Sequence, residues 1–273
     1  MKMTGTKKTA LLITGAAGGV GQALVQMALT LPGVDVVVAT DIREEVTALF
    51  PDERVLSFVM DAAGEVSLQA VRARLHGEGV QVKYLINNAG IFFFHPVSEM
   101  TGTLLDRIVR VNTLAPVLTV SVFLDDLLAT GGRVVQISTC GVRFPTLFQA
   151  YPATKIAMEA FSTSMRQELG LVGVELSLVR AGAINTALMR EMKQLPVPAE
   201  ESRYAVYYKK FLDRVEKDVG RIIAPEKMAA VVRRALTDRK PRRLYVVNRN
   251  RTIRLLSRLP QALLDKMVRK MVK

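Results

Sequence analysis

The sequence predicts an α/β protein in which a doubly wound parallel sheet of about seven strands carries helices on both faces. Apolar runs rich in β-branched residues alternate along the chain with segments of helical periodicity. Runs such as VVVA and RVVQIS are nearly continuously apolar, which is typical of strands that helices cover on both faces. The expected strands are residues 9–14, 34–40, 55–59, 82–87, 133–137, 174–180 and 244–247.

The composition indicates one large domain. The chain has 273 residues, of which 49% are hydrophobic, and this is ample for a sizeable core. We expect the domain to cover residues 1–248, with a helical extension over 249–273. Residues 187–220 interrupt the alternation with two prolines and an aromatic cluster, and we expect them to form a lid. The apolar run near the N-terminus is too short for a signal peptide, and no run is long enough to span a membrane.

The positive charge is concentrated at the C-terminal end. The net charge is +13, and residues 240–273 contain eleven lysines and arginines against one acid, Asp265. The rest of the chain is therefore close to neutral. The single cysteine, Cys140, excludes an internal disulfide and leaves no zinc-ligand spacing. We therefore expect no metal site and a cytoplasmic location.

A basic amphipathic helix is expected from Pro260 onward. Its apolar residues recur at helical spacing among four cations. Such a helix can lie on an anionic membrane surface, or it can pack on the protein itself, over a substrate entrance or between subunits. Nucleic-acid binding is not expected, because no aromatic residue follows Val246 to stack on bases. The apolar residues are Leu263, Leu264, Met267, Val268, Met271 and Val272.

A glycine-rich turn, TGAAGGVG, joins the first strand to a helix expected at residues 22–31. Gly15, Gly19 and Gly21 would let backbone approach a pyrophosphate at the helix N-terminus, although small residues in such a turn are often purely structural. Asp41 follows Gly21 by twenty residues, at the end of the second strand, where a carboxylate can bind an adenosine ribose. A 2′-phosphate would be repelled there, while Arg43 would soften the repulsion. NAD is therefore favoured over NADP.

Tyr151 and Lys155 lie four residues apart in YPATK, thirteen residues after Ser138. If residues 152–170 form a helix, as their apolar spacing indicates, the two side chains project from one face on consecutive turns. A neighbouring ammonium stabilises a phenolate and lowers the pKa of the phenol. Tyr151 is then a candidate acid and base, although this spacing also occurs on ordinary helix surfaces.

In order and spacing these motifs resemble the short-chain dehydrogenase/reductase (SDR) family, from Thr9 to about Val247, and in particular its steroid- and retinol-converting members. The resemblance implies a Rossmann fold and hydride transfer between NAD(P) and an alcohol or ketone. It implies that Tyr151 exchanges a proton with the substrate oxygen and that Ser138 holds this oxygen. Lys155 would bind the nicotinamide ribose, and Asn112 would support a proton-relaying water. Thr139 could compete with Ser138, because the serine motif is one residue shorter than usual.

The same resemblance implies a set of positions along the cofactor. It places the adenine-contacting aspartate at Asp61, the NNAG segment at residues 87–90, and the nicotinamide-contacting threonine at Thr186. The expected cofactor-binding residues are Gly15, Gly19, Val20, Gly21, Asp41, Asp61, Asn88, Ala89, Gly90, Tyr151, Lys155, Gly182, Ile184 and Thr186.

The expected substrate pocket is largely apolar and is built from residues 91–96, 142–150 and 187–220. A bulky secondary alcohol or ketone of steroid, retinoid or long-chain type fits such walls best, although half of these side chains could be core. His95 is expected to be a loop hydrogen-bonder. The expected pocket residues are Phe92, Phe94, Val142, Phe144, Phe148, Met189 and Met192.

The family also implies a homodimer or homotetramer, formed through the helices that follow Leu104 and Tyr151. Other functions stay open at this point. The chain could be an NADP-dependent carbonyl reductase, a nicotinamide sensor without turnover, or a peripheral membrane protein. The complete set of Asn112, Ser138, Tyr151 and Lys155 argues against the sensor, since a retired site has no physical reason to keep an activated phenol.

Overall fold

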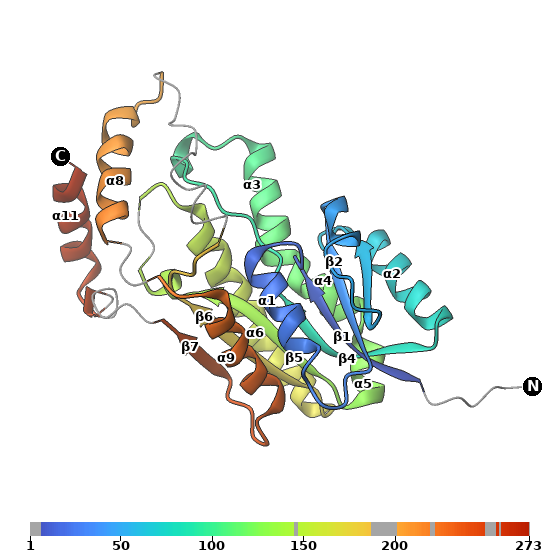
Figure 1. Ribbon diagram of the computed structural model, residues 1–273. Helices are drawn as coiled ribbons and strands as arrows, with labels where there is room; N and C mark the ends of the chain where they lie inside the picture. Colours follow the sequence, from blue (N-terminus) through green and yellow to red (C-terminus); the bar gives the residue numbers. More distant parts are fainter. Residues whose placement is uncertain are drawn as a thin grey trace, which may run out of the picture.

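The protein is an α/β structure with one seven-stranded parallel sheet (Figure 1). The computed structural model describes residues 7–144, 147–186, 201–218, 222–248, 255–256 and 258–272. The strand order is β3-β2-β1-β4-β5-β6-β7, and all neighbouring strands run parallel, so the predicted fold class is confirmed. The strands are β1 (Lys8–Thr14), β2 (Val36–Asp41), β3 (Val55–Val59), β4 (Val80–Asn87), β5 (Arg133–Thr139), β6 (Glu175–Ala181) and β7 (Leu244–Val247).

Helices cover both faces of the sheet. On one face α1 (Gly19–Ala28) packs against α9 (Pro225–Thr237) over a core that includes Leu24 and Val232. The second core contains Leu68, Phe123 and Leu169 from the helices of the other face. These helices are α2 (Glu65–Gly77), α4 (Ala115–Val122), α5 (Leu124–Thr130) and α6 (Ala150–Leu171).

The order of the sheet reverses between β1 and β4, which lie side by side at its centre. Chain segments leaving these two strands turn to opposite faces, and a crevice opens outside their carboxyl ends. The strand predictions differ from the structure by two residues or fewer at each end. The continuous apolar runs therefore identified buried strands correctly.

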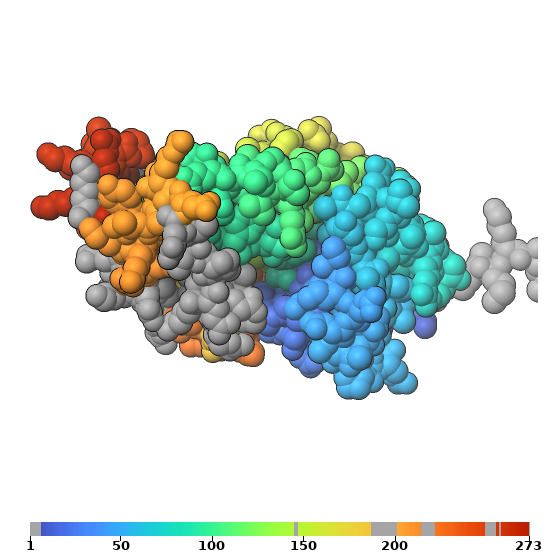
Figure 2. Space-filling model, turned by 90° about the horizontal axis from the view of Figure 1, so that it is seen from above, coloured from blue at the N-terminus to red at the C-terminus, as the bar shows by residue number. Residues whose placement is uncertain are grey.

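A third cluster of apolar side chains lies at the C-terminal end of the molecule, where α8 (Ala205–Asp218) and α11 (Gln261–Val272) pack side by side (Figures 1 and 2). Its buried members are Phe94, Phe148, Tyr208, Phe211 and Val272. The predicted C-terminal helix is therefore present, and one face of it packs on the protein's own surface.

In the described part of the chain, no single helix combines the length and hydropathy needed to cross a membrane. Only the segments Gly102–Val122 and Leu124–Thr130 meet the criterion together, and they are bent by 56° at their junction.

Candidate active site

The glycine-rich turn lies at the carboxyl end of β1 and leads into α1. Gly15 has a φ of +69°, and an added Cβ would approach the backbone of Ala89 at 2.8 Å. At Gly21 an added Cβ would lie 2.2 Å from the Gly15 carbonyl oxygen. At Gly19 the nearest atom would be 3.7 Å away, on Thr186, so the protein itself has room for a side chain there. Gly15 and Gly21 are required by the turn, whereas Gly19 keeps a surface open.

The N-terminus of α1 is suited to an anion. Its first turn contains no acidic residue, and its N-cap, Gly18, makes no side-chain hydrogen bond. Helix N-termini with exposed N–H groups attract phosphates. Val20, the second residue of the helix, is half-buried and packs against the core beside α1.

Asp41 lies at the end of β2 and is buried. Its Oδ2 accepts a hydrogen bond of 3.0 Å from the backbone N–H of Ala17, in the glycine-rich turn. Its Oδ1 accepts from the backbone and side chain of Arg43, at 3.1 and 3.2 Å. Asp61 follows β3 on the exposed surface and accepts from the Ala63 N–H. Both carboxylates therefore lie at the same edge of the sheet as the turn.

The segment after β4 is tied to the glycine-rich turn. The Thr14 hydroxyl oxygen accepts hydrogen bonds from the backbone N–H groups of Asn88 and Ala89, at 3.1 and 3.0 Å. The Asn88 amide donates back to the carbonyl oxygens of Thr14 and Gly15, both at 3.0 Å. An added Cβ at Gly90 would lie 3.2 Å from Asn112 Oδ1 and 3.7 Å from Lys155 Nζ, so this loop passes directly over the site.

The segment after β6 completes the same edge. Gly182 lies so close to Asn248 that an added Cβ would be 2.0 Å from its carbonyl oxygen. Ile184 is buried and pairs with Ile223. Thr186 lies opposite Gly19, as the Cβ geometry of that glycine shows.

Tyr151 and Lys155 lie in the first turns of α6, as expected. Lys155 is almost fully buried, and its ammonium donates a 3.0 Å hydrogen bond to the Ile137 carbonyl oxygen and lies 5.8 Å from the Tyr151 ring centroid. Burial raises the pKa of Tyr151 to about 12. Burial also lowers the pKa of Lys155 to about 8, against the opposing effect of the Glu159 charge. The expected lowering of the tyrosine pKa is therefore wrong for the protein alone, because desolvation of the phenolate outweighs the distant ammonium. Tyr151 is a neutral phenol at pH 7.

Ser138 is the residue before the last in β5 and is buried. Its hydroxyl donates a 2.5 Å hydrogen bond to Glu159, which also forms an ion pair with Arg180. Thr139 instead caps a short 3-10 helix by accepting from the Gly141 N–H at 3.1 Å. Of the two hydroxyls, Ser138 is thus the one bonded to α6. The sequence interpretation missed Glu159, although its position one turn after Lys155 is a signal, and missed Arg180, for which the sequence offers no signal.

Asn112 is fully buried in a π-helical turn, η3 (Arg110–Leu114), between α3 (Gly102–Val109) and α4. Its Oδ1 accepts from the Ile91 N–H at 2.9 Å, and its Nδ2 donates to the Ile91 carbonyl oxygen at 2.8 Å and to Thr154 Oγ1 at 3.2 Å. The asparagine therefore joins the loop after β4 to α6. Single π-turns of this kind occur often at functional sites.

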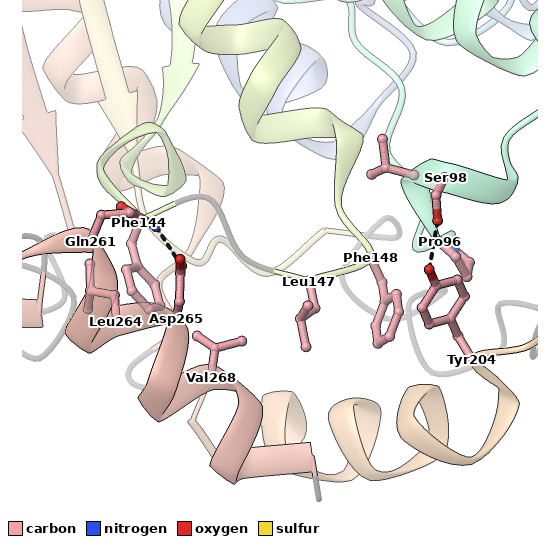
Figure 3. Close-up of a pocket in the computed structure, with 11 residues that line it drawn as sticks. Pro96, Ser98, Phe144, Leu147, Phe148, Tyr204, Gln261, Leu264, Asp265 and Val268 are labelled. Atoms are coloured by element: carbon pink, nitrogen blue, oxygen red, sulfur yellow. Dashed lines mark hydrogen bonds between the residues drawn. The ribbon is translucent and has the colours of Figure 1, made fainter.

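An apolar cavity of about 520 Å³ lies beside α11 (Figure 3). Of the residues expected in the substrate pocket, Phe144 and Phe148 line this cavity, and Phe148 is buried with a φ of +59°. Phe92 and Phe94 do not line the cavity, and their rings pack edge to face against each other. Val142 does not line it either and is half-buried in η4 (Cys140–Arg143). Met189 and Met192 lie outside the described residues. The complete lining is Pro96, Val97, Ser98, Phe144, Leu147, Phe148, Tyr204, Gln261, Leu264, Asp265 and Val268.

Packing of the C-terminal helix on the protein itself is one of the alternatives that the sequence leaves open, and in the structure α11 forms one wall of this cavity. In Figure 3, Leu264 of α11 lies beside Phe144, and Val268 points from α11 toward Leu147. His95 is a loop hydrogen-bonder, as expected, since its ring Nδ1 lies 3.0 Å from the Pro96 carbonyl oxygen.

Residues 9–195 match the family model described as short chain dehydrogenase. The protein belongs to this family. It is similar to the NADPH-dependent 3-dehydrocapnine reductase of Ornithobacterium rhinotracheale, with 26% identity over 96% of each chain. It is also 32% identical to mouse (Mus musculus) retinol dehydrogenase 5, over 59% of this chain and 55% of the relative. A crystal structure of a short-chain dehydrogenase from Streptomyces avermitilis superposes with a TM-score of 0.73 and 24% identity, covering 98% and 96% of the two chains, and shows the shared fold.

As a short-chain dehydrogenase, the protein is an oxidoreductase that acts on CH–OH groups with NAD(P). The residues present fit such a cofactor. Gly19 keeps space at the open N-terminus of α1, and the buried Asp41 lies beside the glycine-rich turn. Gly19 and Thr186 would flank the phosphates, and Asp41 would hold the adenosine ribose. The bound nicotinamide supplies or accepts the hydride.

Gly19→Ala should fold normally but bind the cofactor at least about tenfold more weakly, because the methyl group meets only van der Waals contacts in the protein yet covers the helix N-terminus. Gly21→Ala is the matched control, since its Cβ would collide with backbone and should destabilise the fold by about 1–3 kcal/mol. Calorimetric titration with NAD and NADP and thermal unfolding measure the two effects. Unchanged cofactor affinity in Gly19→Ala would contradict the assignment.

Lys155→Met should unfold at higher urea concentration than wild type at pH 7, while losing turnover. The lysine pKa falls from 10.5 in the unfolded chain to about 8 in the folded protein. Below pH 8 the lysine is protonated in the folded and in the unfolded protein, and burying its charge lowers the free energy of unfolding by an amount on the order of 3 kcal/mol. This cost disappears as the pH rises toward 10.5. Losing the Ile137 hydrogen bond offsets about 1–2 kcal/mol of the gain.

The stabilisation by Lys155→Met should therefore shrink or reverse by pH 10. Arg166→Met, on the same helix, is the control, because arginine stays protonated throughout this range. Urea unfolding at pH 7 and pH 10 gives the comparison. If Lys155→Met were less stable than wild type at pH 7, the buried ammonium would not destabilise the folded protein, and the prediction would be wrong.

Proposed function

We propose that the protein is an NAD-dependent dehydrogenase that interconverts a bulky apolar secondary alcohol and its ketone, of steroid, retinoid or long-chain type. The observation that carries the proposal is the juxtaposition of Ser138, Tyr151 and Lys155 with an aromatic wall. Phe92 stacks edge-on against Tyr151, with ring centroids 5.3 Å apart. The proposed acid and base, Tyr151, thus lies next to an aromatic side chain that would contact an apolar part of the substrate.

A continuous row of rings leads from this tyrosine to the cavity beside α11. Neighbouring ring centroids in the row are between 4.8 and 5.9 Å apart. Phe94, Phe211 and Phe148 are buried, so the row is a packed apolar wall, and an elongated apolar substrate would contact it through the partly exposed rings Phe92 and Tyr204. The rings, in order from the site, are Tyr151, Phe92, Phe94, Phe211, Phe148 and Tyr204.

The proposed roles of the residues follow from their protonation. Tyr151, as a neutral phenol, donates its proton to the substrate oxygen during ketone reduction, and as the phenolate it accepts the proton of the alcohol in the reverse direction. Ser138 contacts the same oxygen by a hydrogen bond. Lys155 lies beneath the tyrosine, where its charge stabilises the phenolate once the site is filled.

The preference for NAD rests on Asp41. Its carboxylate is buried at the end of β2 and would repel a 2′-phosphate at the adenosine ribose. The NADPH-dependent relative favours the alternative cofactor, and Arg43 beside Asp41 is the residue that would accommodate it. An NADP-dependent carbonyl reductase is therefore the second candidate.

We also propose a homodimer or homotetramer. Exposed apolar side chains on α3 and α6 support it: Leu105, Val109, Ile156 and Phe161 are each between 39% and 47% exposed. These helices follow the positions from which the family resemblance predicts assembly.

The outer face of α11 supports contact with an anionic membrane surface by an otherwise cytoplasmic enzyme. Leu263, Met267 and Met271 recur every four residues and are 44%, 39% and 41% exposed. Lys266 and Lys270 lie between them in the sequence and are exposed as well. Exposed apolar residues flanked by cations favour the headgroup region of anionic lipid.

Wild-type protein should reduce NAD, and NADP less well, with at least one member of a panel of steroid, retinoid and long-chain secondary alcohols. Tyr151→Phe should lose at least about a hundredfold in kcat, because it removes the transferable proton. Absorbance of the reduced nicotinamide measures both. Tight NAD binding without turnover of any panel member would favour the sensor. Turnover with NADP alone would favour the carbonyl reductase.

Met267→Glu combined with Met271→Glu should reduce sedimentation with vesicles of phosphatidylcholine and phosphatidylserine, and vesicles without phosphatidylserine should bind little wild type. The control is Val66→Glu with Leu171→Glu, which makes the same charge change at side chains 80% and 88% exposed on α2 and α6. Wild-type protein that stays in the supernatant with both vesicles would contradict the membrane proposal.

A further inference from the structure

Three side chains from different elements meet at Glu159, one turn of α6 after Lys155. Ser138 on β5 and Arg180 on β6 are directly paired residues of neighbouring strands. Both reach the Glu159 carboxylate. Glu159 Oε1 accepts a hydrogen bond of 2.5 Å from the Ser138 hydroxyl and one of 2.8 Å from Arg180 Nε. Its Oε2 accepts from Arg180 Nη2.

This group is shielded from solvent, so its hydrogen bonds are strong. Ser138 is 2% exposed and Glu159 is 9% exposed. A carboxylate that accepts from a hydroxyl and a guanidinium forms short charge-assisted bonds. Arg180 forms an ion pair with Glu159 and so compensates the charge of the carboxylate. The Lys155 ammonium donates instead to the Ile137 carbonyl oxygen, at 3.0 Å.

A serine hydroxyl has one proton to donate and two lone pairs that accept. With its proton directed to Glu159, Ser138 presents only an acceptor to the substrate. An alcohol can donate its hydroxyl proton to such an oxygen, whereas a ketone has no proton to give. Of the two substrates of the proposed reaction, only the alcohol can therefore form a hydrogen bond with Ser138 while the serine proton stays on Glu159.

We propose that Glu159, held by Arg180, is a positioning residue that fixes the Ser138 proton and makes the site bind the alcohol in preference to the ketone. This inference rests on the proposed function and adds a specificity determinant to it. Binding the ketone requires Ser138 to rotate and give up its bond to the carboxylate. The overall equilibrium of the reaction is unchanged. A tighter-bound alcohol shifts the equilibrium between the bound alcohol and the bound ketone by the same factor, so the two effects cancel.

Glu159→Gln combined with Arg180→Leu tests the proposal without leaving an unpaired ion in the core. In the wild type Arg180 Nε and Ser138 donate to the same oxygen of Glu159, so the guanidinium must be absent before an amide N–H can donate to Ser138, reverse the hydrogen bond and release the serine proton. The probes are 2-decanone with the oxidised cofactor and 2-decanol with the reduced cofactor, which are pairs that cannot transfer hydride, and calorimetric titration measures their dissociation constants. We expect the ratio of the ketone to the alcohol dissociation constant to fall about tenfold.

A second variant, Glu159→Leu with Arg180→Leu, removes both charges together and so leaves no unpaired ion in the core. It should shift the ratio in the same direction. Ser162→Ala is the control, since Ser162 is buried on the same helix but donates to the Met158 carbonyl oxygen, and it should leave the ratio unchanged.

The outcomes separate the two levels of inference. Suppose that the wild type binds both probes and that the folded variants keep the same ratio of the two dissociation constants. Glu159 is then merely structural, and the inference is overturned while the proposed function stands. If neither probe binds the wild type, the proposed substrate class fails and this inference fails with it. A lower ratio of the ketone to the alcohol dissociation constant in both variants supports the positioning role.

Discussion

The hydrogen bonds between Thr14 and Asn88 hold together the two strands at which the order of the sheet reverses. The Thr14 hydroxyl accepts from two backbone N–H groups after β4, and the Asn88 amide donates to two carbonyl oxygens in the glycine-rich turn. Buried backbone groups in irregular segments need partners, and here each loop satisfies the other. The glycine-rich turn and the loop over the reactive residues are therefore placed by one set of contacts.

The region beneath α6 shows a second constraint, the burial of polar groups. Lys155, Asn112 and Glu159 each bond α6 or its neighbours to a different part of the sheet edge. Buried polar groups are costly unless they are satisfied, so such a network permits few alternative arrangements. Tyr151 owes its position to this network. The same burial raises its pKa to about 12, which keeps the phenol protonated before any ligand is present.

The C-terminal end closes the apolar side of the site. Val272 and Leu264 of α11 are buried, and Tyr208 and Phe211 of α8 pack against Phe148. The Tyr208 hydroxyl donates to the Phe94 carbonyl oxygen at 3.2 Å, which ties α8 to the loop after β4. The basic extension is thus part of the wall beside the cavity, while its outer face keeps apolar and cationic side chains in solvent.

The sequence by itself determined the sheet, because buried parallel strands leave continuous apolar runs. It also identified the glycine-rich turn, Asp41, and the pairing of Tyr151 with Lys155, since their spacing is local and helix or strand geometry converts it directly into position. The tertiary structure decided what depends on contacts between distant segments. Arg180 meets Glu159 only because β6 lies beside β5, and α11 borders the cavity only because it packs on α8. The tyrosine pKa likewise follows from burial, which is a property of the whole fold rather than of the residues next to it in the chain.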